Sequence, residues 1–199
     1  ILNIDTLIFE PLFTLTQNYE IAPCLAKECA KTGNNIYVIK LKEGVVWQNG
    51  NPFTGEDVKF TIETINQGNS IYKYNTSHIT NIEVVDINTV KLTLDADVPF
   101  FVYNLIFPIV SSAYYQGEDF YNSAKTPIGT GKFTITNIST NNITLAKNSK
   151  YRDLENDPIK IDTIKINLYT SMGEAYNNFK MGNIDLLDTS NPNFQDYIG

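Results

Sequence analysis

The chain has 199 residues, a length typical of one domain or of one lobe of a larger protein. Hydrophobic residues make up 42% of it and charged residues 19%, a balance that supports a folded core and excludes a disordered chain. There are 22 acidic and 15 basic side chains, so the formal net charge is −7. Nucleic acids and anionic membrane surfaces are therefore not expected as partners, because both require a basic surface.

The first half of the chain predicts hairpins and extended segments. Asn34 and Asn35 form a turn ahead of residues 36–41, whose alternating apolar side chains predict a strand. Residues 45–47 are expected to stay extended as far as the turn-forming residues 48–52.

A helix is predicted after Thr54. This threonine lies three residues before Asp57, a spacing in which a hydroxyl and a carboxylate satisfy free backbone N–H groups at a helix start. Val58, Ile62 and Ile65 then share one helix face and predict its buried side. Because this cap explains the acidic pair at positions 56 and 57, the pair does not indicate general acid–base catalysis.

Two further hairpins are predicted along the chain. Apolar residues alternate over 82–94 around a turn at 86–88, and over 133–146 around a turn at 140–142. Between these hairpins, Pro99 is expected to open a short aromatic helix.

The last part of the chain predicts a strand, a helix and another strand. Residues 161–169 alternate and give the clearest pattern of a long strand, and residues 184–187 predict another strand. Between them, Ser171 and Glu174 form an S-x-x-E box at a helix start, and Gly182 is placed to end that helix. Together the elements predict an α/β chain of the α+β type with a mixed sheet.

Residues suited to catalysis or metal binding are sparse. His78 is the one histidine and lies in a polar stretch, so no nucleophile–base pair is predicted. Cys24 and Cys29 are the two cysteines; two core-facing or free thiols are favoured, with a disulfide or a metal site as alternatives. We therefore predict that the protein is not an enzyme and that it needs no cofactor or metal.

Residues 127–131, PIGTG, look superficially like a phosphate loop. The Walker pattern requires a hydroxyl residue after its lysine, whereas Lys132 is followed by Phe133. A third glycine at dinucleotide-binding spacing is missing as well. We expect Gly129 and Gly131 to provide unusual backbone dihedral angles that tie a loop against a sheet.

Several phrases stand in a fixed order along nearly the whole chain. Residues 37–58 read YVIKLKEGVVWQNGNPFTGEDV. Further phrases are LIFEPL at 7–12, APCLAKE at 22–28, FPIVSS at 107–112, PIGTGKF at 127–133, LAKNSKY at 145–151 with IDTI at 161–164, and AYNNFKMGNID at 175–185. Together they resemble the family 5 extracellular solute-binding proteins, the peptide- and nickel-binding receptors of ABC importers. Gln48, Asn49 and Lys132 depart from the family's usual histidine, aspartate and proline, but an asparagine turn keeps the same geometry.

The resemblance implies a lobe of the class II periplasmic-binding-protein fold. Residues 1–199 would form most of the N-terminal lobe, with a hairpin-rich subdomain at about 25–125, and the second lobe and a C-terminal return segment would lie outside the chain. The first residues, ILNIDTLIFEPLF, show no signal peptide or lipidation motif, so we expect any such segment to lie outside the chain as well.

The same resemblance implies a function. The chain would belong to the substrate-binding component of an ABC transporter that binds oligopeptides or dipeptides for import, with a short peptide ligand and ABC permease subunits as partners. It would be an extracellular, cell-surface lipoprotein or a periplasmic protein that meets the membrane only through an anchor. A nickel, metal-chelate or sugar receptor on the same scaffold, or a surface interaction module without transport, are the alternatives.

Candidate ligand-binding residues also come from the resemblance. The phrase that contains Tyr72 is similar to one whose tyrosine faces the ligand in oligopeptide receptors. The segment that crosses between the lobes and borders their cleft corresponds to Asp188, Thr189, Ser190 and Asn191. A half-buried surface aromatic, for Tyr72, and an ordinary linker, for the other four residues, are the competing interpretations.

Overall fold

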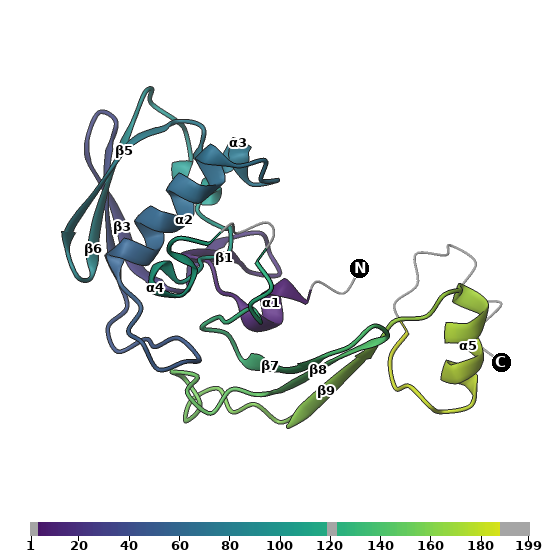
Figure 1. Cartoon of the computed structure of the whole chain (residues 1–199). Coiled ribbons are helices and arrows are strands. Elements are labelled where there is room, and N and C mark those ends of the chain that lie inside the picture. Colours follow the sequence, from purple (N-terminus) through teal and green to yellow (C-terminus); the bar gives the residue numbers. More distant parts are fainter. Residues whose placement is uncertain (1–3, 119–122, 188–199) are drawn as a thin grey trace.

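The structure, a computed structural model, describes residues 4–118 and 123–187 of the chain (Figure 1). These residues form three separate β-sheets, five α-helices and one 3-10 helix. All strand pairs formed by the described residues are antiparallel. The predicted α+β class is therefore confirmed, but the mixed sheet expected from the sequence is replaced in the described residues by antiparallel sheets.

The largest sheet is built from the two hairpins of the first half of the chain. Its strand order is β3 (Ala26–Gly33), β4 (Ile36–Leu41), β6 (Thr89–Leu94) and β5 (Ile79–Asp86). The α2 helix (Gly55–Gln67) packs against this sheet (Figure 1). As predicted, Val58, Ile62 and Ile65 of α2 are buried, and they join the larger of two hydrophobic cores.

Short elements lie between the larger sheet and the rest of the described chain. They are α1 (Asp5–Ile8), the paired strands β1 (Phe13–Leu15) and β2 (Ile21–Pro23), α3 (Lys73–Thr76), the 3-10 helix η1 (Phe101–Asn104) and α4 (Ser112–Tyr115). The aromatic helix expected after Pro99 is thus a 3-10 helix. It begins at Phe101 because Phe100 has a left-handed backbone, with φ of 55°, and stands outside it.

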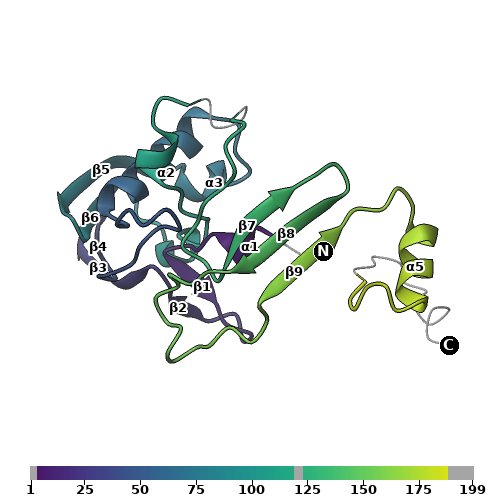
Figure 2. The same ribbon diagram turned by 60° about the horizontal axis from the view of Figure 1, so that its bottom comes forward.

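The third sheet consists of β7 (Phe133–Ile138), β8 (Asn142–Lys147) and β9 (Thr163–Asn167). Figure 2 shows it extending away from the larger sheet, with α5 (Met172–Lys180) beyond its end. A smaller core, which includes Ile8 and Phe133, joins this sheet to α1. The third sheet is therefore attached to the body of the protein through the N-terminal helix.

Two strand predictions in this region need correction. The strand predicted over 161–169 is shorter, because only Thr163–Asn167 pair with β8. The prediction of a strand at 184–187 was wrong, because these residues pair with no strand in the part of the chain that the structure describes. An alternating pattern forms a strand only where a neighbour supplies the ladder of hydrogen bonds. The predicted ends of α5 are confirmed: Ser171 Oγ accepts the N–H of Glu174 at 3.2 Å, and Gly182 has a φ of 72°.

The carboxylate of Asp57 holds three segments together. Its Oδ2 accepts the N–H of Thr54 at 2.9 Å, which completes the predicted capping box, and the indole N–H of Trp47 at 3.2 Å. Its Oδ1 accepts the N–H and the hydroxyl of Ser112 at 2.7 and 2.8 Å. Asp57 is 2% exposed, so these four donors replace water. The sequence predicted the bond to Thr54 but not the other three.

We expect Asp57→Ala to destabilise the protein more than Thr54→Ala. The threonine change removes half of a helix cap, which costs about 0.5 to 2 kcal/mol. The aspartate change leaves several buried donors without an acceptor and is expected to cost about 3 kcal/mol or more. Urea unfolding of the parent and of the two variants measures both losses of stability. An equal or smaller loss in Asp57→Ala would show that the carboxylate does not connect the three segments.

Gly129 and Gly131 pack against the end of α1. A Cβ atom at Gly129 would lie 1.8 Å from the carbonyl oxygen of Ile8, and one at Gly131 would lie 2.7 Å from it. The N–H of Gly131 donates to this same oxygen at 2.8 Å. The glycine loop is thus attached as predicted, but the prediction that unusual backbone dihedral angles cause this was wrong. Neither residue has a positive φ, and close approach of two backbones is what requires glycine here.

Gly129→Ala is therefore expected to destabilise the protein by about 1 to 3 kcal/mol, because the new methyl group forces α1 and the glycine loop apart. Gly173→Ala is the matched control. Gly173 lies in α5 with open space where its Cβ would stand, and alanine favours the helix. Thermal melting should drop for Gly129→Ala and stay level or rise for Gly173→Ala. Similar melting of Gly129→Ala and the parent would contradict the contact with Ile8.

Candidate functional site

A hollow of about 370 Å³ opens beside α1, the β1–β2 sheet and the segment 106–108. We call it the α1 pocket. Its lining includes the apolar side chains of Phe9, Leu15, Tyr72 and Ile106, together with Glu10 and Cys24. Leu15 is exposed and Glu10 is buried, and we call the Glu10 side of the lining the base of the pocket.

The structure places Tyr72 in the wall of the α1 pocket. Its ring is half-buried and packs against Phe107, with 6.4 Å between the ring centroids. The turn before it is held by Ser70, whose hydroxyl accepts the Tyr72 N–H at 3.1 Å. Burial, and next the charge of Asp5, raise the pKa of Tyr72. The hydroxyl therefore stays protonated at neutral pH and is able to donate a hydrogen bond.

The other four predicted binding residues fall in the C-terminal part of the chain. Asp188, Thr189, Ser190 and Asn191 lie outside the described residues. The structure consequently describes one of the five predicted positions, and that one lines a pocket.

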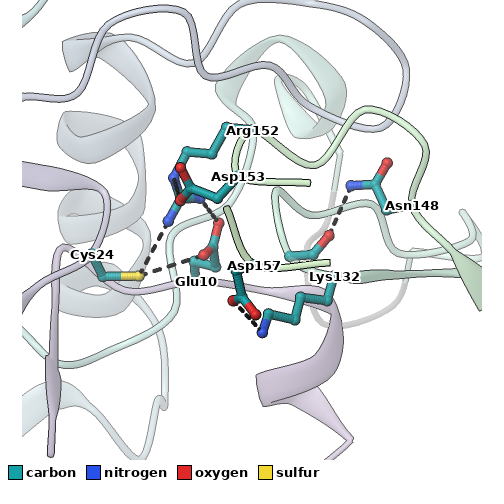
Figure 3. Close-up of polar contacts among 8 residues, drawn as sticks. Glu10, Cys24, Lys132, Asn148, Arg152, Asp153 and Asp157 are labelled. Atoms are coloured by element: carbon teal, nitrogen blue, oxygen red, sulfur yellow. Dashed lines mark hydrogen bonds and ion pairs between the residues drawn. The ribbon is translucent and has the colours of Figure 1, made fainter. Parts of the chain in front are cut away.

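Glu10 stands just after α1, and its carboxylate has two partners that sequence reasoning missed. Arg152, from the loop between β8 and β9, forms an ion pair with Glu10 through Nη1 (Figure 3). The thiol of Cys24 donates to Glu10 Oε1 at 3.5 Å, and Arg152 Nη2 lies 3.9 Å from Cys24 Sγ. The side chains of Arg152 and Glu10 are only 13% and 11% exposed. The base of the α1 pocket therefore contains a buried ion pair in contact with a thiol.

The protonation states of this cluster follow from burial and from its charges. Burial alone would lower the pKa of Arg152, but the hydrogen bond and the charge of Glu10 raise it above its usual value. Burial and then Glu10 raise the pKa of Cys24 to about 12, so this thiol is protonated at neutral pH. Removing one partner of such a pair strands a buried charge, at a cost on the order of 3 to 5 kcal/mol.

The loop that supplies Arg152 is anchored on both sides of it. The side-chain amide of Asn148 donates to the carbonyl of Gly131 at 2.7 Å, and Lys132 pairs with Asp157 at 2.5 Å (Figure 3). The guanidinium of Arg152 stands over the ring of Tyr151, 5.3 Å from its centroid. Arg152 is thus held toward the pocket by the same glycine loop that packs on α1.

The remaining polar residues singled out in the sequence do not join this site. Cys24 and Cys29 are both free thiols, as favoured above. His78 pairs with Asp95 at 2.8 Å on the larger sheet. The described residues contain no group of three or more His, Cys, Asp and Glu side chains arranged to hold a metal ion. None of their helices is long and apolar enough to cross a membrane.

Comparison with known proteins identifies the family. Residues 20–198 match the family described as "Bacterial extracellular solute-binding proteins, family 5 Middle". The match covers most of the chain, and the chain belongs to this family. Its members are extracellular or periplasmic solute-binding proteins, a class that binds rather than converts its ligands.

Three relatives illustrate the similarity. The glutathione-binding protein GsiB of Escherichia coli strain K12 is 28% identical over 137 residues, which cover 64% of this chain and 26% of that protein. The crystal structure of NikZ from Campylobacter jejuni in complex with Ni(L-His) has a TM-score of 0.83 and 27% identity, over 96% of this chain and 40% of that one.

The oligopeptide-binding protein AppA of Bacillus subtilis, in complex with a nonapeptide, has a TM-score of 0.84. It is 19% identical over 98% of this chain and 40% of its own, so it supports the fold alone. The chain thus spans about a quarter of the length of the curated relative and about two fifths of the two structural ones.

Proposed function

We propose that the chain forms part of the substrate-binding component of an ABC importer that captures short peptides without covalent chemistry. The observation that carries this proposal is the α1 pocket, which combines an apolar wall, the Tyr72 ring and a buried polar base in a chain of the family 5 solute-binding proteins. Peptide side chains of many kinds fit such a site, because apolar contact and a few polar groups suffice to hold them. The glutathione-binding relative supports the same ligand class, since glutathione is a short peptide.

Residues 1–199 are proposed to form most of the N-terminal lobe of this receptor, including the hairpin-rich subdomain at about 25–125. The extent of the structural matches supports this, because nearly the whole chain aligns with about two fifths of each relative. Exposed apolar side chains around α5, namely Leu168, Met172, Met181 and Leu186, support it as well. Apolar surface of this kind is usually covered by another part of a protein.

The proposal extends to partners and location. Permease subunits would receive the ligand, and a lipid anchor outside residues 1–199 would hold the receptor at the cell surface. The segment that contains Asp188 to Asn191 is proposed to border the same cleft as Tyr72. Binding of a nickel complex is the second candidate function, because the NikZ structure with Ni(L-His) is 27% identical to this chain.

The test is to identify the ligand that the whole receptor carries when it is purified without denaturation. Native mass spectrometry is expected to show a mixture of short peptides that is released on unfolding. A uniform load of a nickel complex would favour the second candidate. A uniform load of sugar, or a receptor that binds no added peptide, would contradict the peptide proposal.

If Tyr72 contacts the ligand, Tyr72→Ala in the whole receptor should weaken peptide binding by about 1 to 3 kcal/mol, through the loss of aromatic contact and of a hydroxyl partner. Tyr37→Ala is the matched control. Tyr37 is 7% exposed and packs 4.7 Å from the ring of Phe101 in the larger core, so its loss should lower stability. Calorimetric titration and thermal melting separate the two effects. Unchanged affinity of Tyr72→Ala, with lower melting, would assign Tyr72 to packing.

A further inference from the structure

The base of the α1 pocket holds a negative charge that is neutralised from outside the pocket. Glu10 lines the pocket and is 9% exposed, whereas Arg152 is not among the lining residues and contacts Glu10 from the β8–β9 loop (Figure 3). A buried carboxylate that lacks a partner acts strongly on any charged group nearby, because little water screens it. The ion pair with Arg152 removes most of that field.

We propose that Arg152 is a positioning residue that determines the charge preference of the α1 pocket. Its guanidinium holds the Glu10 carboxylate in place and neutralises the charge that this carboxylate brings to the base of the pocket. A cationic ligand group gains nothing there, and an uncharged group with an apolar body is preferred. As far as it concerns peptide ligands, this inference rests on the function proposed above.

The geometry explains why arginine suits this position. One nitrogen of its planar guanidinium pairs with Glu10, while another lies 3.9 Å from Cys24 Sγ. A lysine, whose charge sits on one nitrogen, does not reproduce such a forked arrangement. Arg152 also stands over Tyr151 and has the carboxylate of Asp153 at 3.3 Å from its Nε. The guanidinium is thus held in one orientation before any ligand arrives.

Cys24 supplies a direct reporter of the charge at this position. It lines the pocket and contacts both members of the ion pair. We propose to treat the whole receptor with two methanethiosulfonate reagents that carry either a trimethylammonium or a sulfonate group. The thiolate attacks the sulfenyl sulfur, a mixed disulfide forms and methanesulfinate leaves. The ratio of the two rates reports the local potential, because the fraction of thiolate affects both reagents equally.

Cys29 is an internal control. It lies in β3, packs against the larger core and is not among the residues that line the pocket. Lys27 stands between the two cysteines, so trypsin separates them and mass spectrometry measures each rate independently. A faster reaction at Cys29 in a variant would show that its fold is loosened. The ratio of rates at Cys24 is therefore compared among the variants in which Cys29 reacts at the parent rate.

The experiment is a double-mutant cycle of four proteins: the parent, Arg152→Gln, Glu10→Gln and the double variant. Arg152→Gln should shift the ratio at Cys24 toward the cationic reagent by about fivefold or more, as one unpaired charge a few ångströms away predicts. Glu10→Gln should shift it toward the anionic reagent, and the double variant should return to the parent ratio. Asp5, an exposed acidic residue of the pocket lining, and Asp153, which contacts Arg152, are present in all four proteins, so their charges affect all four ratios alike.

Equal ratios in all four proteins would overturn the proposal, even if every variant were less stable. If Arg152→Gln fails to fold, Glu10→Gln and the double variant decide. A purely structural role for Arg152 would lower the melting temperature and leave both ratios unchanged. The proposal requires opposite shifts that cancel when both residues are replaced.

A second experiment titrates the whole receptor with two peptides of equal length. They differ at one position, where one peptide has methionine and the other has lysine. The parent should favour the methionine peptide, and Arg152→Gln should move the preference toward lysine by severalfold. If the thiol ratios shift but no variant binds either peptide, the charge role of Arg152 stands and the peptide function fails. If the peptides bind but the ratios stay equal, the peptide function stands and the role of Arg152 is overturned.

Discussion

The carboxylate of Asp57 is the contact on which the larger core depends. Buried ions are tolerated only where hydrogen bonds replace water, and Asp57 receives four of them, from Trp47, from the backbone of Thr54 and from Ser112. These donors come from the turn before α2, from the residue that caps α2 and from the start of α4. One side chain therefore sets the position of a helix, a turn and the returning chain, and the apolar face of α2 is aligned on the sheet as a result.

Glu10 is the second buried carboxylate of the described chain, and it is neutralised in a different way. Asp57 is surrounded by neutral donors of its own core, whereas Glu10 depends on a guanidinium from a loop 142 residues away. That loop is positioned by Gly131 through Asn148, and Gly131 in turn binds the end of α1, two residues before Glu10. The glycine loop thus holds both members of the ion pair, and the third sheet contributes to the shape and charge of a pocket that it does not line.

The position of Tyr72 likewise depends on contacts with a distant segment of the chain. The tyrosine packs on Phe107, which is fully buried, and the side-chain amide of Asn75 donates to the carbonyl of Asn104 at 3.2 Å. These contacts connect α3 to the segment around η1 and leave the tyrosine ring as the wall of the α1 pocket. An aromatic side chain held this way loses little freedom when a ligand packs on it, which favours binding.

The sequence by itself determined the local elements, because their signals lie within a few residues: the alternation in 36–41, the caps at Thr54 and Ser171, and the order of phrases that identifies the family. Only the tertiary structure decided the rest. No local pattern pairs Glu10 with Arg152 or brings Gly129 against Ile8, since these contacts join distant parts of the chain. The strand expected at 184–187 failed for the same reason. Alternation is a property of the segment, whereas a strand, a buried charge and a pocket are each completed by a partner that the fold supplies.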